Sequence, residues 1–350
     1  MAIKRANRTL LTGLLAVAQL ALASSVALMP AASAQDAKAR PHIDLAFCID
    51  TTGSMQSEID NVKAKTKEIV AKLAGGKPSP LIRVGLVAYR DRGDEYVTKV
   101  FPFTEDIDKM VKDISGLQAN GGGDTPEAVN EALHSSVHDL AWSSDKKTLK
   151  LLFLIGDAGP KHYPNDYDWH AEAKQAIANG IEINTLGCQG LETSMPTVEG
   201  VDVFKEIAHL ADGKYEPLSY RHEIAEAGGK RATIVSSGGS LYKVAGGAGA
   251  DWHAGAEKLA AEGRAVRMDA RAFTGGIMVD TAAAAPAMAG TRAYTMSSLK
   301  AKSSPAAMAA SAPVGSYAMT SRDENNLADL VLQATKDAAK KQLKVDFKEK

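Results

Sequence analysis

The chain has 350 residues, 45% hydrophobic and 24% charged, so it is long enough to bury a full core in one sizeable domain or two modest ones. Its 41 basic and 42 acidic residues give a formal net charge of −1, which offers no reason to expect a nucleic-acid partner. Two cysteines, Cys48 and Cys188, are too few for a disulfide scaffold.

Residues 1–34 have the pattern of a cleaved secretory signal. Three basic residues precede a largely apolar run over 10–29, which ends in Pro30 and the small-residue triplet Ala32-Ser33-Ala34. The run approaches the roughly 20 residues of a membrane-spanning helix, so an uncleaved anchor is the alternative. Polar residues dilute the run, and we therefore expect cleavage after Ala34. The mature protein is expected to be periplasmic or secreted, with no transmembrane segment.

Between residues 41 and 220, short β-rich runs alternate with helical patterns. Strands are predicted at 43–49, 81–89, 97–103, 149–155, 181–187 and 214–218, and Pro102 restricts the third of them to a sheet edge. Helices are predicted after the first strand, at 107–114, after Thr125 and Pro126, at 171–178 and at 201–213. This rhythm predicts an α/β fold with a doubly wound, mostly parallel sheet flanked by helices.

After residue 220 the composition changes. Residues 221–320 are rich in Gly, Ala and Ser, which predicts little regular structure apart from a short helix at 251–262 and a strand at 272–279. Ser321 and Glu324 form a capping box that predicts an amphipathic C-terminal helix over 321–345. The sequence does not indicate what this helix packs against.

Three predicted loops at one edge of the sheet carry oxygen ligands. The first offers Asp50, Thr52 and Ser54, the second Thr125 after three glycines, and the third Asp157 directly after a buried strand. Hydroxyl and carboxylate oxygens suit a hard cation, and so few formal charges favour Mg²⁺ over Ca²⁺.

The stretches "DTTGS", "GGGDTPEAV" and "LFLIGD" resemble the metal-ion-dependent adhesion site of the von Willebrand factor type A domain, over roughly residues 43–220. With "DTTGSM", "AYRDRGDEY" and "IGDAGPKHY", the chain looks most like the branch of that family that also accompanies alpha-type kinases. The resemblance implies a Rossmann-like fold that holds Mg²⁺, with Mn²⁺ as a substitute. The implied ligands are the hydroxyls of Ser54, Thr52 and Thr125, with Asp50 and Asp157 acting mostly through water, and an Asp or Glu of a partner protein fills the open position.

The sequence differs from the family's metal-site motif at two positions, and two of the implied ligands have another possible role. Thr52 stands where the family usually has serine, which keeps the hydroxyl. Asp124 precedes Thr125, so a direct carboxylate ligand stays open. Ser54 and Thr125 are also suitable helix N-caps, and capping is compatible with coordination at adjacent atoms.

The family's strand order would place the strand at 149–155 between those carrying Cys48 and Cys188. The two backbones would then lie about 9.6 Å apart, which exceeds the Cα separation of about 7 Å that a disulfide tolerates. We therefore expect two buried free thiols.

Two further motifs bear on binding. Arg92-Gly93-Asp94 spells an adhesion tripeptide, although a turn after a strand favours Gly and Asp for conformational reasons alone. The rim loop that contains His162, Tyr163, Trp169 and His170 matches no metal motif, and we expect it to form a polar, aromatic rim that influences partner choice.

The leading hypothesis is therefore an exported, metal-dependent protein-binding module, active in adhesion or complex assembly, and not an enzyme. One alternative is a metal-assisted hydrolase in which Asp50 or Asp157 activates water and His162 acts as acid or base. Another is a scaffold in which the metal is purely structural.

Overall fold

The computed structural model describes residues 40–75, 77–192, 200–225, 231–246, 251–268, 324–345 and 347. Its main sheet has the order β3-β2-β1-β4-β5-β6. The strands are β1 (His42–Asp50), β2 (Leu81–Tyr89), β3 (Thr98–Thr104), β4 (Leu149–Gly156), β5 (Ile181–Gly187) and β6 (Tyr215–Pro217). Every neighbouring pair is parallel except β2 and β3. The predicted fold class is confirmed, as is the edge position of the strand that contains Pro102.

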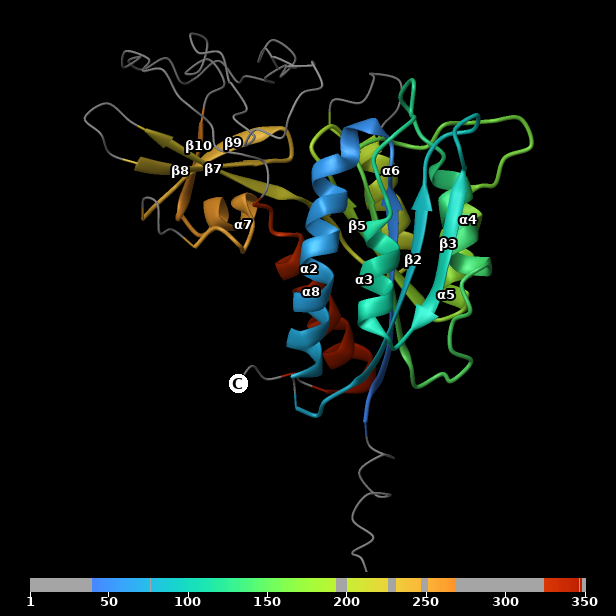
Figure 1. The fold of residues 1–350 in the computed structure, drawn as a ribbon. Helices are drawn as coiled ribbons and strands as arrows, with labels where there is room; N and C mark the ends of the chain where they lie inside the picture. The colour runs from blue at the N-terminus through green and yellow to red at the C-terminus, as the bar shows by residue number, and fades with distance from the viewer. Residues whose placement is uncertain are drawn as a thin grey trace, which may run out of the picture. The chain divides into compact units, whose positions relative to one another are not determined.

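Helices cover both faces of this sheet (Figure 1). Residues of α2 (Gln56–Ala74) and α3 (Ile107–Ser115) share one hydrophobic core with Leu45 and Phe47 of β1. Residues of α4 (Val129–His138), α5 (Trp169–Ala178) and α6 (Gly200–Leu210) share the other core with Ala46 and Cys48. The alternation along β1 follows from the two-residue period of a strand, and it explains why both of its faces are apolar.

The two cysteines are buried and free, as expected. β4 lies between β1 and β5 in the sheet, so Cys48 at the end of β1 and Cys188 just after β5 are separated by a whole strand. Burial raises the pKa of the Cys48 thiol to about 12. Neither thiol is therefore prone to ionise at neutral pH.

A second, antiparallel sheet corrects the expectation for residues 221–320. It contains β7 (Ser219–Ala225), β8 (Arg231–Ser237), β9 (Ser240–Val244) and β10 (Ala265–Met268), and α7 (Ala256–Ala261) shares its core. Gly238 and Gly239, with φ of 53° and 68°, join β8 to β9. Two consecutive positive φ values are what a two-residue hairpin turn needs, so these glycines indicate a hairpin and not an unstructured segment.

Several expectations lie outside the described residues. They are the signal at 1–34, the strand at 272–279 and Ser321 of the capping box. Glu324 is described, and its carboxylate pairs with Arg221 at 2.7 Å instead of capping a helix. The short helix predicted at 251–262 is present as α7, which begins later than expected.

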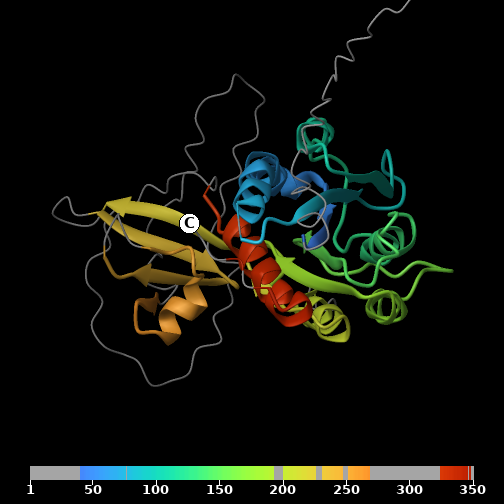
Figure 2. The ribbon, with the colours of Figure 1, turned by 90° about the horizontal axis from the view of Figure 1, so that it is seen from below.

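The C-terminal helix α8 (Leu327–Ala338) packs on the part of the chain built around the main sheet, which we call the first domain. Leu327 and Val331 are fully buried in the core that contains α2 and β1, and Figure 2 shows α8 beside α2. The helix begins after Asn326, later than predicted, and ends in a π-helical turn over Ala339–Leu343. Within the described part of the chain, no helix combines the length and the apolar character that crossing a bilayer would require.

Candidate metal centre

Asp50, the last residue of β1, is fully buried and forms the centre of the predicted site. The backbone N of Thr52 and its Oγ1 both donate to Asp50 Oδ1, at 2.8 and 2.7 Å. Asp50 Oδ2 is buried and has no hydrogen-bond partner among the described residues. Burial, and next the charge of Asp157, raise the pKa of Asp50 well above its usual value. A buried carboxylate with one unsatisfied oxygen is costly unless a cation or a proton is present.

Asp157 follows β4, the strand next to β1, so it reaches the same edge of the sheet as Asp50. Burial raises the pKa of Asp157 above its usual value, and an interaction with Ser54 offsets part of this rise. The structure therefore brings Ser54 of the first motif close to Asp157 of the third. Ser54 lies in a 3-10 turn over Gly53–Met55 and makes no helix-capping bond, because α2 begins only at Gln56. The capping interpretation of Ser54 is wrong.

The glycine-rich loop packs on the first motif. Gly53 N donates to Gly121 O at 3.3 Å, and Asn120 N donates to Thr51 O at 3.1 Å. Gly122 has a φ of +64°, and a Cβ there would lie 2.6 Å from the Thr52 Cβ, so only glycine permits this approach. The second loop is thereby held against the turn that contains Thr52.

Thr125 is exposed, and no hydrogen bond joins it to the other four predicted ligands within the described residues. It is also not a helix N-cap, since α4 begins at Val129. Glu127 N donates to Gly159 O at 3.0 Å and Lys161 N donates to Glu127 O at 2.8 Å, so the chain is extended here and forms a β-bridge. Because Glu127 forms this bridge, α4 begins later than predicted, and Thr125 is not its N-cap.

Asp124 and Glu127 add two further carboxylates in and after the glycine-rich loop. Glu127 is buried, and burial together with the charges of Asp50 and Asp91 raises its pKa to about 9. Asp124, whose role the sequence leaves open, is 63% exposed and lies 2.8 Å from Lys161 Nζ. Lys161 Nζ also lies 2.6 Å from Asp91. Asp124 therefore has a cationic partner of its own, whereas the acids deeper in the site repel one another.

The donor set agrees with the predicted cation. The side chains of Asp50, Thr52, Ser54 and Asp157 offer oxygen atoms alone as ligands, and hard divalent cations prefer oxygen ligands. A cation would satisfy Asp50 Oδ2 and offset the repulsion between Asp50 and Asp157. The residues present therefore fit Mg²⁺.

The charged side chains of the tripeptide Arg92-Gly93-Asp94 contact other residues of the protein. The Arg92 guanidinium pairs with Glu131 and lies 3.1 Å from Asp166, and it covers the Tyr163 ring at 4.2 Å. Asp94 Oδ2 accepts from Gly122 N at 3.0 Å. Both charged side chains of the tripeptide thus hold the loops around the site in place.

The rim differs in part from the expectation. His162 and Tyr167 are exposed, but Trp169 is only 6% exposed and packs in the core beneath α5. The Asp168 side chain caps this helix by accepting from His170 N at 2.9 Å, so the loop ends one residue before Trp169. Trp169 is therefore a core residue and not a partner anchor.

One cluster was missed by sequence reasoning. His134 and His138 of α4 lie against Glu172 of α5. The spacing of the two histidines within "EALHSSVHDL" was the available signal, but their partner comes from another helix.

Comparisons with known proteins agree with this architecture. Residues 44–215 match the family model described as von Willebrand factor A domain. The chain is 30% identical over 144 residues to an ariadne-like RING finger protein of Acanthamoeba polyphaga mimivirus, and 34% identical over 121 residues to von Willebrand factor A domain-containing protein 7 of Homo sapiens. These matches span 41% and 35% of this chain but 13% and 12% of those proteins, so the chain covers about an eighth of their length.

Solved structures include similar folds. The pilus adhesin SpaC from Lactobacillus rhamnosus GG, in its open conformation, aligns with 56% of this chain and 33% of its own, with 13% identity and a TM-score of 0.40. The VWA domain named SpRpn10 aligns with 50% of this chain and 86% of its own, with 12% identity and a TM-score of 0.36.

Proposed function

We propose that the protein, whose residues 44–215 match the von Willebrand factor A domain family, is an exported, metal-dependent protein-binding module. Such domains generally mediate protein interactions or adhesion. The finer proposal is that Mg²⁺ binds at the strand edge and that a carboxylate of a partner protein completes its coordination.

The observation that carries this proposal is the state of Asp50. Its carboxylate is fully buried, one oxygen is held by Thr52, and the other has no partner in the described part of the chain. A structural aspartate in a core would normally have both oxygens satisfied. The remaining oxygen, next to the charge of Asp157, supports a role in holding a cation.

The residues that would hold Mg²⁺ are Thr52, Ser54, Thr125, Asp50 and Asp157. Bound Mg²⁺ would supply a positive charge that hydroxyl ligands leave only partly neutralised, and this favours an incoming Asp or Glu. We propose binding and not hydrolysis because His162, the acid or base of the alternative, is exposed, and no described contact joins it to Asp50 or Asp157.

Metal binding is tested by titrating Mg²⁺ into the purified full chain by calorimetry and by following thermal unfolding. At a free Mg²⁺ concentration of 100 times Kd, the native state should gain about 2.7 kcal/mol. Asp50→Asn, which keeps the side-chain shape, should abolish both signals. Asp124→Asn is the matched control and should keep them, because Asp124 is paired with Lys161 at the surface. Equal loss in both variants would contradict the proposed ligand set.

Partner binding is tested separately by affinity capture from a cell-envelope extract, with Mg²⁺ or with a chelator. We expect proteins that elute with the chelator and that Asp50→Asn fails to capture. Mg²⁺ binding without any such capture would favour the structural scaffold. Turnover of phosphoester or peptide substrates that Asp50→Asn abolishes would favour the hydrolase.

A further inference from the structure

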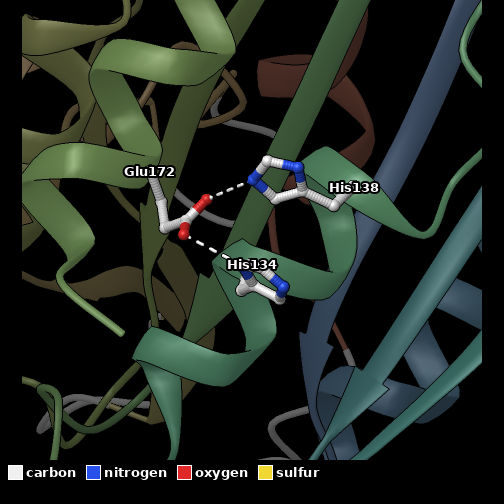
Figure 3. Close-up of side chains that lie close together, drawn as sticks. All are labelled: His134, His138 and Glu172. Atoms are coloured by element: carbon white, nitrogen blue, oxygen red, sulfur yellow. Dashed lines mark hydrogen bonds and ion pairs between the residues drawn. The ribbon is translucent and has the colours of Figure 1, made fainter. Parts of the chain in front are cut away.

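A second group of metal-type ligands lies on helices α4 and α5. It shares no residue with the proposed Mg²⁺ site of Asp50, Thr52, Ser54, Thr125 and Asp157, which we call the strand-edge site. We call His134, His138 and Glu172 the His–Glu cluster. His134 Nδ1 lies 2.9 Å from Glu172 Oε1, and His138 Nε2 lies 2.9 Å from Glu172 Oε2. Figure 3 shows the carboxylate of α5 between the two imidazoles of α4, with one oxygen directed to each.

The sequence places these ligands together for a simple reason. His134 and His138 are four residues apart on α4, so they lie on the same face, one turn from each other. α4 and α5 pack side by side on the same face of the sheet. Glu172, in the first turn of α5, contacts both histidines of α4. Two residues on one helix and one on its neighbour therefore converge.

The chemistry and the size of the cluster suit Zn²⁺ or a similar transition-metal ion. Two imidazole nitrogens and a carboxylate oxygen are typical ligands of zinc, whereas Mg²⁺ prefers oxygen alone. Ligand atoms at about 2.1 Å from one metal lie about 3.4 Å apart in a tetrahedral site. The three ligand atoms of the cluster all lie within 4.8 Å of one another, so binding requires a contraction of at most about 1.4 Å.

Part of the cluster is already fixed in orientation. The His134 ring stacks on Tyr167 with the ring centroids 3.6 Å apart and the planes 7° apart, and the Glu172 side chain is only 10% exposed. The His138 side chain is 41% exposed. Two ligands are thus held by their surroundings, and the third offers an entry path and the freedom to close onto an ion.

The plainer interpretation is a hydrogen-bonded clamp between two helices. It uses the same contacts and places the two imidazole rings with their centroids 4.5 Å apart. A dication bound by both imidazoles and the carboxylate would use these same groups as its ligands. The two interpretations differ in whether the chain responds to Zn²⁺.

We infer that the His–Glu cluster is a transition-metal site, in which His134, His138 and Glu172 bind one Zn²⁺ and water occupies the remaining position. The ion would cross-link α4 to α5. The site is separate from the strand-edge site in its residues and in its ligand chemistry.

The test uses the full chain in saturating Mg²⁺, so that the oxygen-ligand site does not compete. Zn²⁺ is titrated by calorimetry, and Co²⁺ is added as a spectroscopic substitute whose visible absorption reports nitrogen ligation. We expect one Zn²⁺ per chain and a visible Co²⁺ band. Changing an outer-shell partner typically weakens metal binding about 10–100-fold, so His138→Gln and Glu172→Gln, which remove a ligand, should lose at least about tenfold.

His209→Gln is the matched control, because His209 is an exposed histidine on α6 outside the cluster. It should keep both signals, as should Asp50→Asn. His138→Gln changes an exposed side chain, so it remains informative even if Glu172→Gln fails to fold. Zn²⁺ affinity unchanged in His138→Gln, or lost in His170→Gln instead, would overturn the assignment. Loss confined to Asp50→Asn would also overturn it, by placing the ion at the strand edge.

Discussion

The Tyr220 hydroxyl donates a hydrogen bond of 2.8 Å to Glu58 Oε1, between residues 162 positions apart. Tyr220 belongs to β7 of the second sheet, and Glu58 belongs to α2, one turn after Ser54. Ser57 Oγ donates to the other Glu58 oxygen at 2.7 Å. The second sheet is therefore attached to the helix that follows the first motif.

Tyr220→Phe should destabilise the protein by about 1–2 kcal/mol, because Glu58 loses a donor and Gln189 N, which donates to the same hydroxyl at 3.1 Å, loses an acceptor. The measurement is urea unfolding at neutral pH. Tyr167→Phe is the matched control, since Tyr167 is 45% exposed and should change stability by no more than about 0.5 kcal/mol. Equal effects of the two changes would mean that the bond to Glu58 contributes nothing.

Gly122→Ala should disturb the strand-edge site from the second loop. The new Cβ would lie 2.6 Å from the Thr52 Cβ at a positive φ, so we expect a loss of about 1–3 kcal/mol in stability and weaker Mg²⁺ binding. Gly123→Ala, one residue later, would place its Cβ in open space, with no atom within 4 Å, and should be tolerated. Calorimetric Mg²⁺ titration and urea unfolding of both variants provide the comparison. Normal Mg²⁺ affinity in Gly122→Ala would show that Thr52 takes no part in binding.

Arg92→Ala tests whether the adhesion tripeptide has a structural role. Removing the guanidinium leaves the Glu131 and Asp166 carboxylates without this partner, which should cost about 1–3 kcal/mol in urea unfolding. Arg264→Ala is the control and should cost about 0–1 kcal/mol, because the ion pairs of Arg264 with Asp251 and Glu262 are exposed. A stable Arg92→Ala protein that loses adhesion to cells would instead support the tripeptide as a recognition motif.

The fold and part of the site could be predicted where the hydrophobic pattern of a strand and the geometry of a parallel sheet lead to the same conclusion. β1 and β4 are apolar because both faces are covered, and parallel neighbours end at the same edge, so Asp50 and Asp157 could be placed together in advance. The remaining features depend on tertiary contacts, which local sequence patterns do not reveal. The bridge at Glu127 displaced the start of α4, and the partner of His134 and His138 lies on another helix. The second sheet was missed because Gly238 and Gly239 were assigned to a segment with little regular structure and not to a hairpin turn.

The position of α8 has a consequence for any attempt to isolate the first domain. Leu327 and Val331 complete the same apolar interior as Ile43 and Ile59, so a fragment that stops at residue 220 would leave that interior open to water on one side. Such a fragment should be poorly soluble or aggregate. The smallest well-behaved unit must therefore include α8, because this helix closes a core that β1 begins.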